Sequence, residues 1–175
     1  MSDQILQKVS GDIDPVKRIA LKVPGFDGFI KRSEYRDADK LLREMLVKEA
    51  ETQNQRISQL QRDFISQGEI TNVDDLEASS VKLRTFTDRV KFATRGYAGV
   101  FDPVKKNEPE LAAVYQYDAA MLDQLDNVTR AIDNVEASVG SDGLPAALRN
   151  LRSTSQEMID IFEKREDVLK GIAAA

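Results

Sequence analysis

The chain contains neither cysteine nor histidine, and it also lacks tryptophan. Without cysteine, its 175 residues can form no disulfide, thiolate nucleophile, zinc–thiolate site or iron–sulfur cluster. Without histidine, a Ser-His-Asp triad, a histidine-ligated zinc and the Glu-x-x-His site of di-iron bundles are excluded as well. We therefore expect a protein that is not an enzyme and that binds no cofactor.

Glycine and proline are also scarce, with 9 and 5 residues, so breaks between secondary-structure elements are few. Long apolar runs are missing, since no stretch approaches the roughly 18 apolar residues of a membrane span. Residues 1–8 lack the apolar core of a signal peptide. These observations predict a cytoplasmic location.

The charge balance is mildly acidic, with 25 basic and 30 acidic residues and a net charge of −5. This balance argues against general nucleic-acid binding, which usually needs a basic surface. Apolar residues make up 41% and charged residues 31% of the chain, a mixture that suits long helices with wide solvent-facing sides. The length fits one domain with a sizeable core.

Apolar residues recur at alternating spacings of three and four along four long segments, which predicts four amphipathic helices. We expect these helices at about 33–67, 71–96, 107–139 and 144–172. Gly68 and the turn at 140–143 are short breaks, so each flanking pair of helices should be antiparallel. The predicted fold class is all-α: an elongated up-down-up-down four-helix bundle made of two helical hairpins, with an extra short N-terminal amphipathic helix.

The N-terminal segment, residues 1–32, differs from the predicted bundle, residues 33–175, in its charge. Between residues 15 and 32 there are five basic side chains and one acidic side chain, a net of +4. Apolar residues at helical spacing predict a helix over 13–23, with Asp12 or Asp14 as its cap and Pro15 in its first turn. A proline and two glycines within 23–29 predict a break with tight turns.

Two interpretations of this basic segment remain open. It can lie on an anionic membrane surface or dock in the groove of a partner, as basic amphipathic helices do. Alternatively, it folds back and covers one end of the bundle, with its phenylalanines in the core. The candidate interaction residues are Lys17, Arg18, Lys22, Phe26 and Phe29.

A second candidate surface is the connection at 96–107, which is aromatic and glycine-containing rather than polar. Tyr97 and Phe101 can anchor it to the bundle, because aromatic side chains bury a large area. The alternative is that 95–102 forms an exposed docking loop.

Asp118 falls on the apolar seam of the helix predicted at 107–139, where a carboxylate is costly unless it is paired. Tyr115 lies nearby on the same helix, and we expect the partner of Asp118 among Arg84, Arg89 and Arg95. The site is either an ion pair that fixes the helix register or a polar pocket for a small ligand or ion.

Other polar residues also interrupt the seams, namely Gln53, Ser155 and Arg165 in the other helices. For Gln53 and Arg165 the same two interpretations as for Asp118 stay open, and Arg165 also lies near the bundle end, where a long side chain can reach solvent. Asp118, Asp123 and Asp126 place several carboxylates on one helix, but no EF-hand spacing is present. We therefore expect no metal site.

Three stretches resemble a group of uncharacterised bacterial all-helical proteins: PGFDGF at 24–29, YRDADKLLR at 35–43 and GYAGVFD at 96–102. The resemblance covers about the first two-thirds of the chain. It implies a bacterial origin and brings no known activity with it.

Three functions compete on these observations. The first is a non-enzymatic scaffold or protein-interaction module that binds a protein partner or a second copy of itself. The second is a peripheral membrane protein that acts through its basic N-terminal helix. The third is a small-ligand binder at the polar core site around Asp118.

Overall fold

The computed structural model describes residues 14–93 and 108–174. These residues form six α-helices and one short 3-10 helix, and no strand is present among them, so the prediction of an all-α protein is confirmed. The elements are α2 (Pro15–Lys22), α3 (Phe26–Lys31), α4 (Tyr35–Ser66), η1 (Ile70–Asn72), α5 (Val73–Phe92), α6 (Glu108–Ser138) and α7 (Leu144–Ala174). Within this part of the chain, no helix combines the length and apolarity that a membrane crossing requires.

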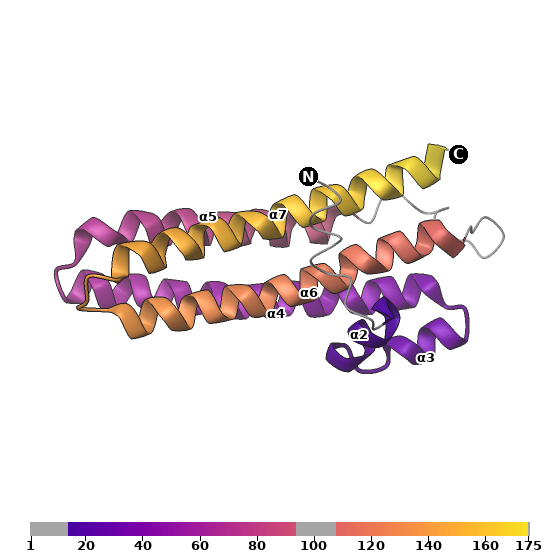
Figure 1. Cartoon of the computed structure of the whole chain (residues 1–175), viewed down its shortest axis with the longest axis horizontal. Helices are drawn as coiled ribbons and strands as arrows, with labels where there is room; N and C mark the ends of the chain where they lie inside the picture. Colours follow the sequence, from indigo (N-terminus) through magenta and orange to yellow (C-terminus); the bar gives the residue numbers. More distant parts are fainter. Residues whose placement is uncertain (1–13, 94–107, 175) are drawn as a thin grey trace.

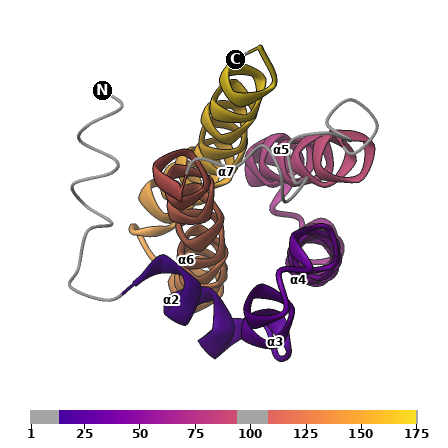
Figure 2. The same cartoon turned by 90° about the vertical axis from the view of Figure 1, so that its right-hand side faces the viewer.

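Four long helices pack side by side into an elongated body (Figure 1). Helices α4 and α5 form one hairpin and α6 and α7 form the other, and both hairpin turns lie at the same end. Seen down the long axis, α4 contacts α5, α5 contacts α7, α7 contacts α6, and α6 contacts α4 (Figure 2). Although α5 and α6 follow one another in the chain, they therefore occupy opposite corners.

The apolar seams explain why these segments are helical and how they pack. In α4 the buried positions from Leu42 onward are spaced by three or four residues and alternate strictly from Leu46, close to the pattern that the sequence predicted. In α6 the burial is wider, because all six positions from Tyr117 to Leu122 are buried. A helix that is buried on every side needs neighbours all round it, and at this level α2, α4 and α7 surround α6.

The turns follow the expected chemistry in most places. Gly68 and Gly140 both adopt the left-handed backbone conformation, with φ of 78° and 77°. Glycine adopts this conformation without strain because it has no Cβ atom. Asp14 caps α2, since its side chain accepts a hydrogen bond of 3.1 Å from the Val16 amide. The break predicted at 23–29 was only partly right: Gly25, at φ 90°, makes the turn, and the chain re-enters a helix at once as α3.

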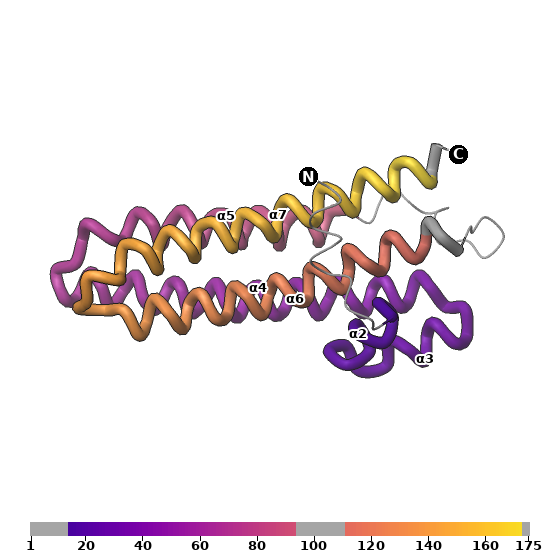
Figure 3. The backbone as a smooth tube through the Cα atoms, in the orientation of Figure 1, coloured from indigo at the N-terminus to yellow at the C-terminus, as the bar shows by residue number. Residues whose placement is uncertain are grey.

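Helices α2 and α3 belong to the same core as the long helices. The backbone folds back after α2 and α3, so that both lie beside one end of the four long helices (Figure 3). Helix α2 packs on α6 and α3 packs on α4, so the two short helices fill the space between α4 and α6. Ile19, Val23 and Phe26 are completely buried there.

Candidate functional site

Asp118 lies inside the protein, 1% exposed, and its partner is Arg165 of α7. The Nε of Arg165 donates to the Oδ1 of Asp118 at 2.5 Å, and its Nη2 donates to the Oδ1 of Asp39 at 2.6 Å. The Nε of Arg43 donates to the second oxygen of Asp39 at 2.8 Å. Two arginines and two aspartates from α4, α6 and α7 thus form one buried charge cluster.

Of the alternatives left open for Arg165, the structure has the buried ion pair and not the side chain that reaches solvent, because only 1% of it is exposed. Its guanidinium finds acceptors on two other helices, Asp118 on α6 and Asp39 on α4. A planar guanidinium with five donors suits this role, since it can bond to carboxylates on different sides at once. The side chain therefore stays inside the core and joins three helices.

The cluster also includes Glu166, whose Oε1 lies 3.7 Å from the Nη1 of Arg165 and is buried without a hydrogen bond, so that three carboxylates face two arginines. Burial raises the pKa of Asp118 to about 6, and the positive charge of Arg165 opposes that rise. For Arg165, burial lowers the pKa, but attraction to Asp118 and Asp39 outweighs burial and the net shift is upward. Arg165 therefore stays charged, while Asp118 gains a proton at a higher pH than an exposed aspartate does.

Tyr115 lies beside the cluster and packs edge-to-face against Phe26 of α3, with ring centroids 5.8 Å apart. Its hydroxyl is buried and makes no hydrogen bond. Burial, and then the negative charge of Asp118, raise the pKa of Tyr115, so the phenol remains protonated. The residue acts as an apolar support for the charge cluster rather than as one of its bonded members.

The arginines that the sequence offered to Asp118 lie elsewhere. Arg84 pairs with Glu77 at 2.9 Å, and Arg89 pairs with Glu163, and both arginines are exposed. The reason is the helix arrangement: α5 carries both arginines and sits at the corner opposite α6. Three other predicted residues lie outside the described residues, namely Arg95, Tyr97 and Phe101.

Sequence reasoning missed Asp39 and Arg43. A signal for Asp39 was present, because extending the α4 seam three residues before Leu42 reaches it. Arg43 follows Asp39 by four residues, which is the spacing of neighbouring side chains on one helix face. If the apolar seam is extended to the start of α4, it places a second carboxylate, that of Asp39, in the core.

The basic N-terminal residues face the bundle through ion pairs. The Nζ of Lys22 contacts Asp123 at 3.0 Å and Asp126 at 2.5 Å, and Arg18 also pairs with Asp123. These two carboxylates on α6 thus neutralise Arg18 and Lys22. Among the described residues, no acidic groups have the arrangement of a metal site. Lys17 points away from this contact and is exposed.

Of the two interpretations of this segment, the structure has the one in which it folds back. Phe26 is fully buried, and Phe29 is partly buried with the Arg32 guanidinium 5.1 Å from its ring centre. Because the apolar face of α2 lies in the core, membrane insertion through that face would require α2 to leave α6.

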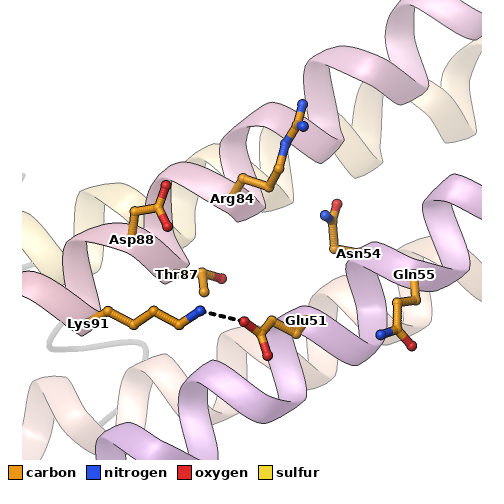
Figure 4. A pocket seen from close by; sticks show the side chains of 7 residues that line it. All are labelled: Glu51, Asn54, Gln55, Arg84, Thr87, Asp88 and Lys91. Carbon is orange, nitrogen blue, oxygen red and sulfur yellow. Dashed lines mark hydrogen bonds and ion pairs between the residues drawn. The ribbon is translucent and has the colours of Figure 1, made fainter.

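Where the structure describes the chain, surface grooves lie between neighbouring helices, and neither Asp118 nor Arg165 lines the groove between α4 and α5, the groove between α5 and α7 or the groove between α6 and α7. The groove between α4 and α5 has a volume of about 300 Å³ (Figure 4). Lys91 and Glu51 form an ion pair of 2.6 Å across it, and the Oδ1 of Asn54 is buried without a hydrogen bond. A second groove, between α5 and α7, is lined mainly by charged side chains.

Comparison with protein-family models, with curated proteins and with solved structures finds no match for this chain.

Proposed function

We propose that the chain is a non-enzymatic helical scaffold that binds a protein partner or a second copy of itself. In this proposal the body is an up-down-up-down four-helix bundle, stiffened at one end by α2 and α3. The observation that carries the proposal is the closure of the buried charge cluster: Arg165 satisfies Asp118 and Asp39 inside the core. A buried cluster whose aspartates are paired with its own arginines suits a structural role better than chemistry on a substrate.

The shape supports the same proposal. Helices α4, α6 and α7 have 32, 31 and 31 residues, which corresponds to rods of roughly 45–50 Å. Long rods offer continuous faces for another protein, as helical bundles and elongated scaffolds do. Salt bridges between helices fix these faces relative to one another, for example Arg56 of α4 with Asp133 of α6 at 2.7 Å.

The test is to measure the mass of the purified full chain by light scattering after size exclusion, and to crosslink it in its native host. We expect a defined dimer, or a protein partner crosslinked in a fixed ratio and identified by mass spectrometry. A monomer that yields no crosslinked protein would overturn the proposal.

A parallel flotation assay with phosphatidylserine-containing vesicles addresses the membrane alternative. Wild-type protein that floats, while a Lys17→Glu, Leu21→Glu variant does not, would favour a peripheral membrane role instead. Both residues are exposed on α2, so the double variant leaves the core intact.

A further inference from the structure

The turn between α3 and α4 differs in its sequence from the other turns between helices. The turns after α2, α4 and α6 each contain a glycine at positive φ, namely Gly25, Gly68 and Gly140. The turn at 32–34 reads Arg-Ser-Glu, and among the described residues Ser33, at φ 60°, is the only residue other than glycine with a positive φ. A residue with a Cβ is strained there, because the left-handed conformation brings the Cβ too close to the following carbonyl oxygen.

The hydrogen bonds of this turn are those of a helix end that usually carries glycine. The amide of Ser33 donates to the carbonyl of Ile30 at 3.0 Å. The amide of Glu34 donates to the carbonyl of Phe29 at 2.9 Å. This pair of bonds is the Schellman motif, in which the left-handed residue is most often glycine. Residues 32–34 include neither glycine nor proline, so with Ser33 in the right-handed region α3 and α4 would join into one continuous helix.

The two helices before this turn dock on the long helices together, and we call them the α2–α3 unit. Helix α2 packs on α6 and α3 packs on α4, and Ile19, Val23 and Phe26 are completely buried in these contacts. The charges are matched as well, because Arg18 and Lys22 pair with two carboxylates of α6. The surface between α4 and α6 therefore takes an occupant that complements it in both apolar area and charge.

A second copy of the chain offers the same surface. Every contact that the α2–α3 unit makes with α4 and α6 of its own chain can form with α4 and α6 of another copy, because the residues are identical. Straightening of the turn at 32–34 carries the unit away from its own α4 and α6 and relieves the strain at Ser33. Exchange of an identical element through a short, strained connection is a low-cost route to a dimer.

We propose that two copies of the chain exchange their α2–α3 units, so that each unit docks on α4 and α6 of the other copy. The inference rests on the proposed scaffold function and names the partner, a second copy, and the way it is held. Ser33 is the hinge. In the monomer Ser33 is left-handed and the unit folds back (Figure 3), whereas in the dimer it is helical and joins α3 to α4.

The first test varies the hinge in the full chain. Ser33→Ala and Ser33→Gly both remove the hydroxyl, but alanine disfavours the left-handed conformation and favours a helix, whereas glycine does the opposite. Each chain is refolded from urea at several concentrations, and its mass is measured by light scattering after size exclusion. Circular dichroism and urea unfolding verify that both variants fold.

We expect the dimer of Ser33→Ala to have a dissociation constant about tenfold or more below that of Ser33→Gly, because two hinges straighten in each dimer. The wild type should lie between the two variants.

The second test shows on which copy α2 docks. One variant carries Arg18→Glu and Lys22→Glu, and the other carries Asp123→Lys and Asp126→Lys, so that each variant alone brings like charges together. When the two variants are refolded together, opposite charges meet at both contacts only if each α2 crosses to the other copy. We expect native mass spectrometry to show the mixed dimer in clear excess over a random mixture.

The matched control is a chain that carries all four charge reversals, which restores opposite charges within one sequence and should dimerise as the wild type does. Equal dissociation constants for Ser33→Ala and Ser33→Gly would overturn the inference, and so would a random mixture of the two charge variants. A wild type and a Ser33→Ala variant that both stay monomeric up to about 1 mM would overturn it as well.

These outcomes separate the exchange from the scaffold function. A crosslinked host protein, or a dimer that responds neither to the hinge nor to charge reversal, would leave the scaffold proposal standing and remove the exchange. A wild-type monomer that yields no crosslinked protein would overturn both.

Discussion

Arg165 and Asp118 face each other in the core at 2.5 Å between Nε and Oδ1, although they lie 47 residues apart on different helices. Their bond ties α7 to α6, and the second bond of Arg165, to Asp39, ties α7 to α4. Both contacts are shielded from water, so their loss would leave unpaired charge in the interior rather than free a surface group.

Replacing Arg165 with alanine should therefore lower the free energy of unfolding by about 3–5 kcal/mol, the usual effect of removing one partner from a buried ion pair. Urea unfolding followed by circular dichroism at pH 7 measures this. The matched control is Arg89→Ala, which breaks an exposed pair with Glu163 and should cost less than about 1 kcal/mol. Similar losses in the two variants would contradict a structural role for the cluster.

The stability should also depend on pH through Asp118. Burial raises its pKa in the folded protein to about 6, above the 3.8 of a free aspartate, so the folded state binds more protons than the unfolded state between those values. Its contribution to stability is thus full below about pH 4 and is lost as the pH rises through about 6. The groups that face it are Arg165, Asp39 and Arg43.

The measurement is the difference in unfolding free energy between wild type and Asp118→Asn at several pH values. We expect that difference to change by about 2–3 kcal/mol between pH 4 and pH 7, with wild type losing ground as the pH rises. A difference that does not vary with pH would show that Asp118 does not titrate in this window.

The apolar face of α2 should contribute more to its packing on α6 than its ion pairs do. Ile19→Ala removes a fully buried side chain and should cost about 2–4 kcal/mol. Arg18→Gln with Lys22→Gln removes ion pairs that are partly exposed, and it should cost about 1 kcal/mol or less in total.

Hydrogen–deuterium exchange over residues 15–22 separates these two effects. Faster exchange in Ile19→Ala than in the double charge variant is the expected order. The reverse order would mean that Asp123 and Asp126, rather than the core, hold α2 on α6.

Replacing Gly140 and Gly171 by alanine should change the stability of the protein in opposite directions. Gly140 has a φ of 77°, so alanine there is strained by about 1 kcal/mol even though nothing lies within 4 Å of the added Cβ. Gly171 lies inside α7 with equal open space, and alanine there should stabilise the helix by up to about 1 kcal/mol. Thermal unfolding of the two variants checks this, and a shared sign would contradict the backbone argument.

The sequence predicted the helices well because their apolar spacing is a local property. The buried positions of α4 and α7, including the polar Gln53, Ser155 and Arg165, follow the predicted seams. The pairing of the helices, which decides which apolar seams face each other, is not encoded in this local spacing. The sequence offered Arg84, Arg89 and Arg95 to Asp118. The placement of α5 opposite α6 removes the first two, and the partner is Arg165 on α7.

The N-terminal segment shows a second limit. A basic amphipathic pattern is the same whether its apolar face meets lipid or a core, so the sequence left both interpretations open. The placement of Lys22 beside Asp123 and Asp126 on α6 depends on a fold-back over about a hundred residues of chain. No periodicity within 13–32 contains that information.

The run of buried positions in α6 from Tyr117 to Leu122 limits which substitutions the protein tolerates there. Along most of α6 and α7, tolerance to polar substitution should rise and fall with a period of 3.6 residues, since one side meets water. None of these six positions faces solvent. Saturation mutagenesis should therefore show low tolerance to polar substitution at all six, without the periodic variation seen elsewhere in the helix. The sequence of α6 should therefore change most slowly at these six positions, where other helices enclose it and where Asp118 pairs with Arg165 of α7.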